Sequence, residues 1–136
     1  MWKCPDCHRE FKNKNQWHSC VIVKEQELFA NLPVHVWDLH EQLKSKCQEH
    51  GVVSVDTTKS CIYFVDQKRF LAIKPRKNGL ILEFVLNREI DLFPVIKIFQ
   101  IGKFRYAHRL AIDQQEDLTD EVIDWIQEAR MLLKNS

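Results

Sequence analysis

The amino-terminal segment holds four residues whose types and spacing suit a metal ion. Cys4 and Cys7 are separated by two residues, and His18 and Cys20 are separated by one. A Cys-Pro-Asp-Cys turn brings two thiolates together, and side chains two positions apart in an extended segment lie on the same side. Three sulfur ligands and one imidazole favour tetrahedral zinc. The spacing therefore predicts a structural zinc knuckle formed by Cys4, Cys7, His18 and Cys20, with no position left for a catalytic water.

Other interpretations of the same cysteines stay open. Cys4-x-x-Cys7-His8 also spells a c-type haem attachment site, but that leaves His18 and Cys20 without a role. A redox Cys-x-x-Cys pair would follow a strand and open a helix, whereas this pair begins at residue 4. The thiols could also carry no ligand, and His8 could replace His18 as the fourth ligand. Zinc binding contributes on the order of 10 kcal/mol, enough to fold a segment as short as residues 1–23.

Basic residues in the centre of the chain are the second chemical feature. Residues 59–105 contain ten basic and four acidic residues, whereas residues 25–58 and 106–136 each have a net charge of −4. We expect the anion-binding positions on the central strands and their turns. Arginine there can bind phosphate or carboxylate through two parallel hydrogen bonds, although a solvated hairpin turn explains the same cations. The candidate ligand-binding residues are Lys59, Lys74, Arg76, Lys77 and His108.

Histidine and aromatic residues on one predicted strand allow two interpretations. His108 shares a strand face with apolar neighbours, so it is either a core histidine or a ligand contact. Tyr63, Tyr106 and Arg105 could form a platform for stacked bases, although strand aromatics usually belong to the core. Cys47 and Cys61 lie on apolar patterns and are expected to be small buried side chains.

The elements that must position these residues follow from hydrophobic periodicity. Apolar residues three and four apart predict helices over residues 36–47 and 118–133, with a short helical connector over 24–32. Alternation predicts strands over residues 52–58, 61–65, 70–74, 80–86 and 104–110, whereas 90–102 is ambiguous. Short connections imply antiparallel hairpins. We therefore expect an α+β domain over residues 24–136, with a mainly antiparallel sheet of four or five strands and both helices on one face.

Several longer stretches of the sequence are similar to a known family. The most specific are Asn15-Gln16-Trp17-His18-Ser19-Cys20 and Lys74-Pro75-Arg76-Lys77, and Asp117-Leu118-Thr119-Asp120-Glu121-Val122 continues the match near the end. The pattern resembles the bacterial family catalogued as domain of unknown function 5655 with an N-terminal zinc knuckle, in which some members are labelled predicted transport proteins. The resemblance implies the zinc site and an α+β fold, and it implies no activity. The sequence departs from the family in Asp66-Gln67-Lys68-Arg69, which is more polar than expected for that hairpin.

Composition places the chain among cytoplasmic globular proteins. Hydrophobic residues make up 45% of the 136 residues, and the net charge is +1. No apolar run is long enough for a membrane span, and the first residues do not read as a signal peptide. In the cytoplasm, cysteines are expected to bind metal or to stay as thiols.

Three functional hypotheses follow. The first is a non-enzymatic binding module with structural zinc, whose basic strands and loops bind an anionic ligand, either a nucleic acid or a phosphorylated molecule. The second is a protein-interaction module that docks a partner through the zinc knuckle, with Trp17 or Trp37 as the anchor. The third is an enzyme that uses His108 and Lys59, and it has least support because the chain lacks a glycine-rich phosphate loop and a Gly-x-Ser-x-Gly elbow. The oligomeric state and the ligand are not encoded in these patterns.

Overall fold

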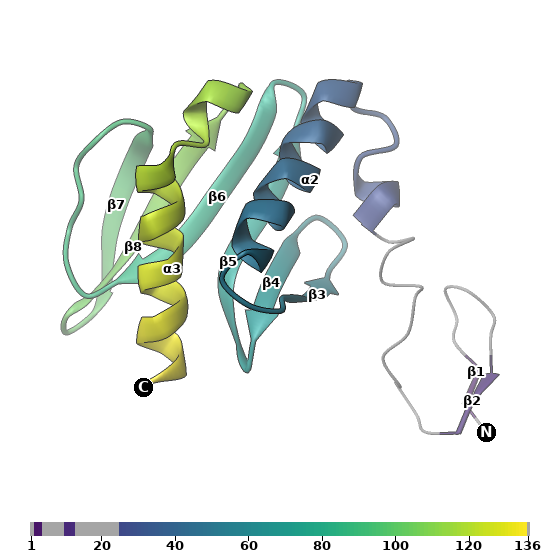
Figure 1. The fold of residues 1–136 in the computed structure, drawn as a ribbon, viewed down its shortest axis with the longest axis horizontal. Coiled ribbons are helices and arrows are strands. Elements are labelled where there is room, and N and C mark those ends of the chain that lie inside the picture. The colour runs from purple at the N-terminus through teal and green to yellow at the C-terminus, as the bar shows by residue number, and fades with distance from the viewer. Residues whose placement is uncertain (1, 4–9, 13–24, 136) are drawn as a thin grey trace.

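The domain is one antiparallel sheet with two helices packed on one of its faces (Figure 1). The computed structural model describes residues 2–3, 10–12 and 25–135. After a helical turn at residues 25–28, the elements are α2 (Val34–Gln48), β3 (Ser54–Thr57), β4 (Ile62–Asp66), β5 (Lys68–Arg76), β6 (Gly79–Leu86), β7 (Val95–Gly102), β8 (Arg105–Ile112), the short helix η1 (Gln115–Asp117) and α3 (Asp120–Lys134). None of the described helices is both long and apolar enough to cross a bilayer.

The sheet has six strands in the order β3-β4-β5-β6-β8-β7. The α+β class is confirmed, but the expectation of four or five strands was too low because β7 was not recognised. Two β-bulges interrupt the pairing of β7 with β8, one between Val95 and Lys97 and one between Gln100 and Gly102. Each bulge adds a residue and breaks the alternation from which a strand is recognised. β7 is also an edge strand, so its burial pattern shows no clean period.

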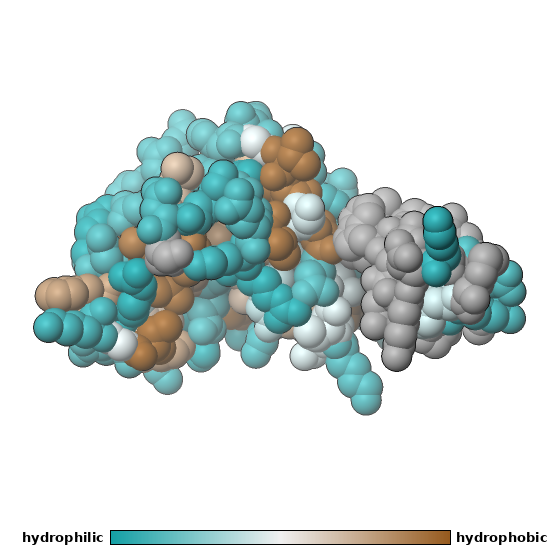
Figure 2. All heavy atoms as spheres, turned by 90° about the horizontal axis from the view of Figure 1, so that it is seen from below, coloured by the Kyte–Doolittle hydropathy of each residue, from teal (hydrophilic) through white to brown (hydrophobic). Residues whose placement is uncertain are grey.

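The surface around β7 is unusually apolar. Figure 2 shows hydrophobic side chains (brown and tan) at its left-hand end, where β7 lies in Figure 1. Five of the eight exposed large hydrophobic residues in the described part of the chain lie in this region, namely Leu92, Phe93, Ile96, Ile101 and Phe104. The two bulges and Lys97 oppose pairing of this edge with another strand, as charges and bulges do on natural sheet edges.

Both helices form where apolar residues recur every three or four positions. In α2, Val36, Leu39, Leu43 and Cys47 are buried. The α3 helix starts at Thr119, whose hydroxyl accepts the N–H of Val122 at 3.2 Å. This satisfies one of the amide groups that a helix leaves unpaired at its start.

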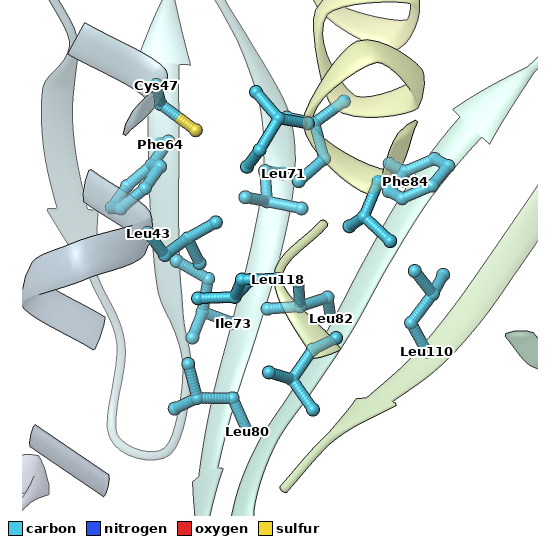
Figure 3. Close-up of a cluster of buried hydrophobic side chains, with 14 of the residues drawn as sticks. Leu43, Cys47, Phe64, Leu71, Ile73, Leu80, Leu82, Phe84, Leu110 and Leu118 are labelled. Carbon is cyan, nitrogen blue, oxygen red and sulfur yellow. The ribbon is translucent and has the colours of Figure 1, made fainter. Parts of the chain in front are cut away.

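One hydrophobic core fills the space between the helices and the sheet (Figure 3). On β6, Leu80, Leu82, Phe84 and Leu86 are all at most 2% exposed and belong to this core. Cys47 and Cys61 are buried free thiols, as predicted. Burial raises the pKa of the Cys47 thiol to about 12, so it stays protonated and acts as a small apolar side chain.

Arg130 joins three elements at one end of the core. Its side chain is only 4% exposed, and Nε donates to the Asp66 carboxylate on β4 at 2.6 Å. The two terminal nitrogens donate to the carbonyl oxygens of Cys47, at 3.2 Å, and Val52, at 2.9 Å. Gly51 permits this approach, because a Cβ there would lie 3.0 Å from the guanidinium and its φ of +129° disfavours other residues.

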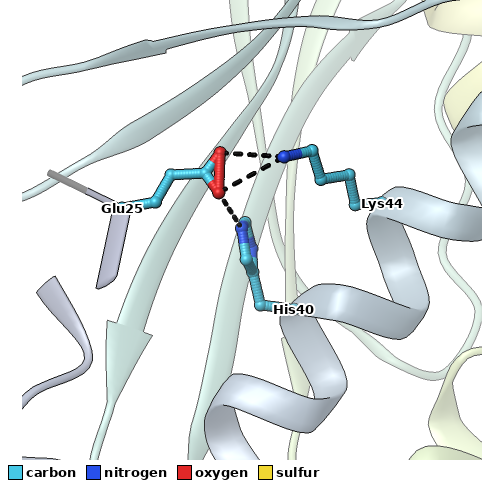
Figure 4. Close-up of polar contacts among 3 residues, drawn as sticks. All are labelled: Glu25, His40 and Lys44. Carbon is cyan, nitrogen blue, oxygen red and sulfur yellow. Dashed lines mark hydrogen bonds and ion pairs between the residues drawn. The ribbon is translucent and has the colours of Figure 1, made fainter. Parts of the chain in front are cut away.

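A second buried charge cluster attaches the start of the domain to α2 (Figure 4). Glu25 is 1% exposed, and its carboxylate lies 3.4 Å from His40 Nε2 and 3.2 Å from Lys44 Nζ. Burial alone would raise the pKa of Glu25, but the His40 hydrogen bond and the Lys44 charge hold that pKa below its ordinary value. The carboxylate is therefore charged and holds the connector against the helix.

Candidate anion-binding face

One row of side chains crosses all six strands on the face opposite the helices. The register aligns one residue from each strand, in the order Asp56, Tyr63, Ala72, Glu83, Arg109 and Lys97. Neighbouring residues on these strands, such as Ile73 and Leu82, point into the core, so the row must point away from it. No described element covers this exposed face in Figure 1.

Rows on either side of the central row continue the exposed face. Towards the β5–β6 turn, Lys74 is aligned with Ile81 and Ala111. Towards the other end, Val85 is aligned with Ala107 and Phe99. The alanine side chains are short, so the middle of the face lies lower than the long side chains around it.

The exposed face carries more positive than negative charge. Two acidic residues lie on it, and both are already paired, Asp56 with Arg69 and Glu83 with Arg109, the latter at 3.3 Å. The other basic residues on the face are Lys74, Arg76, Lys97 and Arg105. Within the described part of the chain, Lys74, Arg76 and Lys97 have no ion-pair partner. These cations are available to an anionic ligand.

Two aromatic rings hold the cations along the sheet. The Arg69 guanidinium lies 4.2 Å from the centroid of the Tyr63 ring. Lys97 and Arg109 each lie 5.6 Å from the centroid of Phe99. Such contacts stabilise a cation over a ring and restrict how far its side chain moves. The face therefore combines positive charge with ring surfaces in fixed places.

Four of the five candidate ligand-binding residues gather near one end of the sheet. Lys74 is on the exposed face of β5, and Arg76 and Lys77 lie at the β5–β6 turn. Lys59 lies in the β3–β4 turn, and this turn is at the same end because β3 to β6 are successive antiparallel strands. All four side chains are exposed.

His108 lies apart from the other candidates, inside the core. It is 0% exposed and its ring stacks on Phe84 with centroids 5.7 Å apart. Nδ1 donates to the Tyr106 carbonyl at 3.0 Å, and Nε2 accepts the N–H of Ile90 at 3.0 Å. Three inter-strand steps separate β8 from β4, about 14 Å, so the structure does not bring His108 to the Lys59 turn.

One family model matches most of the chain. Residues 25–132 match the family model described as "Domain of unknown function (DUF5655)". The chain belongs to this family. No curated protein and no solved structure matches the chain. The match covers the whole sheet of the DUF5655 domain and stops short of the cysteine-rich segment.

The predicted zinc ligands Cys4, Cys7, His18 and Cys20 lie outside the described residues and outside the DUF5655 match. Among the described residues, no group of three or more His, Cys, Asp or Glu side chains could hold a metal ion. Next to the cysteines, the structure describes one pair of short strands. β1 (Trp2–Lys3) pairs antiparallel with β2 (Glu10–Phe11), which sets Lys3 beside Glu10.

Several residues of the exposed face of the DUF5655 domain were not among the sequence candidates. Arg109, Lys97 and Phe99 come together only through the register of β8 with β7, and β7 was not predicted. Alternation alone could have singled out Arg105 and Arg109, because both lie on the same side of a predicted strand. Of the expected stacking platform, Tyr63 and Arg105 lie on the exposed face, whereas Tyr106 is aligned with Leu86 on the covered face.

His108 should make the stability of the DUF5655 domain depend on pH. Burial lowers the pKa of His108 below its ordinary value of 6.5. Its contribution to stability is therefore complete above that ordinary value and is lost as the pH falls towards the folded-state pKa. Urea unfolding from about pH 7 to about pH 5 should show a falling free energy of unfolding, with a shallower fall for His108→Gln.

The matched control for this prediction is His50→Gln, because His50 is exposed. This variant should keep the wild-type pH dependence. Equal slopes for His108→Gln and the wild type would show that the buried imidazole is not the titrating group.

Proposed function

We propose that this protein is a non-enzymatic binding module that holds a single-stranded nucleic acid on its exposed sheet face. The observation that carries the proposal is the charge of that face. It has six basic residues against two acidic ones, and both acids are already neutralised by neighbouring arginines. The helices on the other face lie in the chain segments that have a net negative charge. A polyanion is therefore attracted to one face and repelled by the other.

The shape of the face supports a polymer over a small phosphorylated molecule. Lys74 on β5 and Lys97 on β7 are three inter-strand steps apart, about 14 Å, too far to bind one phosphate group together. Small-ligand sites are concave and usually enclose about 300–1,000 Å³. The cavity that opens among the exposed-face side chains has a volume of only about 170 Å³. Spaced cations on an open surface suit a chain of phosphates.

The aromatic residues support a single strand over a duplex. Tyr63 on β4 lies three inter-strand steps from β8, and Phe99 on β7 lies one step from β8. The two rings are therefore on opposite sides of β8 along the exposed face. Unpaired bases stack on aromatic rings and on guanidinium planes held against such rings, and each stacked base contributes about 1–3 kcal/mol. Bases in a duplex are already stacked on one another and are not free to do so. Exposed sheets with aromatic residues bind single-stranded RNA in this way in other proteins.

Binding of a short fluorescent oligothymidylate, followed by anisotropy, tests the proposal. Each phosphate contact with a single strand contributes about −0.7 to the slope of log K against log salt concentration, so four contacts give a slope of about −3. We expect a slope of this size and weaker binding to a duplex of equal length. Failure to bind at about 50 mM salt, or binding that does not respond to salt, would refute the proposal.

We also propose that Cys4, Cys7, His18 and Cys20 hold one structural zinc ion. The pairing of β1 with β2 supports this, because it brings together the two ends of the segment that contains both Cys4 and Cys7. Protein purified without chelator should contain about one zinc per chain, and Cys7→Ser should lose it. Cys47→Ser should retain the metal, since Cys47 is buried in the core of the domain. Absence of stoichiometric metal in the wild type would contradict this assignment.

A further inference from the structure

The sheet opens between β5 and β6 on the exposed face. Their ladder runs from the pair Arg76–Gly79 to the pair Ala72–Glu83 and then stops. Beyond it, a β-bulge between Phe64 and Val65 shifts the pairing of β4 with β5. A bulge bends its strand and raises its twist, which separates β5 from β6. Phe70 and Leu71 therefore lie beyond the last residue pair between β5 and β6 and have no partner on β6.

A cavity of about 170 Å³ lies at this opening. Its apolar lining includes Phe70, Leu71 and Phe84 of the sheet and reaches Leu133 of α3 on the helix-covered side. Its rim belongs to the exposed face and includes Tyr63, Arg69, Ala72, Glu83 and Val85. We call this cavity the β5–β6 slot. It is too small for a whole nucleotide by the usual size of ligand sites, and its apolar wall does not suit a phosphate.

We propose that the β5–β6 slot accepts one nucleobase of the strand that lies on the exposed face. This inference rests on the function proposed above and adds a specific base-binding position to it. An apolar wall fits the flat faces of a heteroaromatic ring. Glu83 at the rim offers a carboxylate acceptor to the polar edge of the ring.

Two contacts fix the Arg69 side chain at the rim of the slot. It is ion-paired with Asp56, and its guanidinium lies over the Tyr63 ring at 4.2 Å. A guanidinium plane fixed in this way can stack on a base or bind the neighbouring phosphate without losing further side-chain freedom. Lys74 lies two residues along β5 from Ala72 on the same face, so it can bind the next phosphate of the strand.

A comparison between an oligothymidylate and an abasic oligonucleotide of equal length tests the slot. The two ligands carry the same phosphates, and only the first has bases. We expect wild-type protein to bind the oligothymidylate at least about tenfold more tightly, as stacking of one base predicts. Ala72→Leu fills the mouth of the slot and should lower the affinity for oligothymidylate by about tenfold, leaving only the preference for bases that stacking elsewhere on the face provides. Its affinity for the abasic strand should stay unchanged.

Ala111→Leu is the matched control, because Ala111 lies on the same face but away from the slot. It should keep the preference for bases. If Ala72→Leu does not fold, Val85→Leu fills the slot from its other wall and should give the same result. Equal wild-type affinity for both ligands would overturn the slot and the stacking of bases on the face, but not its binding of phosphates. An affinity for oligothymidylate that slot filling leaves unchanged would also overturn the slot, and failure to bind either ligand would overturn both proposals.

Discussion

Replacing Arg130 with methionine is expected to lower the free energy of unfolding by about 3 kcal/mol. The methionine keeps the apolar contacts of the side chain but removes every hydrogen bond of the guanidinium. The carbonyl oxygens of Cys47 and Val52 then lose this donor, and the Asp66 carboxylate loses its closest cation but keeps Lys134, at 3.3 Å. Buried polar groups without partners are costly, so the loss should far exceed that of a surface ion pair. Chemical unfolding of both proteins measures it.

Arg88→Met is the control for this prediction. Arg88 also pairs with a carboxylate of α3, donating to both oxygens of Glu128 at 3.1 and 2.8 Å, but its side chain is 56% exposed. Exposed pairs contribute about 0–1 kcal/mol. The two arginine–carboxylate pairs are similar, but the loss in the free energy of unfolding should be severalfold larger for Arg130→Met than for Arg88→Met. A loss for Arg130→Met no larger than that for Arg88→Met would show that the buried pair does not hold the elements together.

Neutralising two cations of the exposed face should greatly weaken binding of single-stranded nucleic acid. In Lys74→Gln/Lys97→Gln, two phosphate contacts are lost, and the expected decrease in affinity at about 50 mM salt is about fiftyfold. Both lysines are exposed and lack ion-pair partners among the described residues, so the fold should be unaffected. Anisotropy titrations with oligothymidylate measure the decrease.

Lys46→Gln/Lys134→Gln removes the same net charge from the helix side of the protein. This double variant should bind almost as tightly as the wild type, because the removed charges lie on the opposite face. If both double variants lose affinity equally, attraction comes from total charge and not from the exposed face.

Much of the scaffold follows directly from the sequence because its elements have a clear period. On β6, Leu80, Leu82, Phe84 and Leu86 recur at every second position and are all buried, and the buried residues of α2 recur at three- and four-residue steps. The pairing of β6 with β8, which leaves β7 at the edge of the sheet, is not indicated by any local pattern. It depends on strands that are distant in the sequence, and the bulges obscure the alternation of β7.

The candidate site was predictable to the extent that it depends on single strands. Lys74 could be placed on the exposed face because it is one position away from strand residues that alternate as core residues do, and neighbouring side chains on a strand point to opposite faces. Arg109 and Lys97 could not be placed beside each other, because their contact depends on the register of two strands. His108 shows the same limit. Its residue type fits either a ligand or a core position, and only its two hydrogen bonds decide between them.

The most direct test of the account is to locate bound nucleic acid on the protein. Amide resonances of isotope-labelled protein can be assigned and followed by NMR while oligothymidylate is added. The largest shifts are expected at residues of the exposed face, including Tyr63, Ala72 and Arg109, while those of α2 and α3 remain small. Largest shifts on the helices, or no shifts at saturating oligonucleotide, would contradict binding on the exposed face.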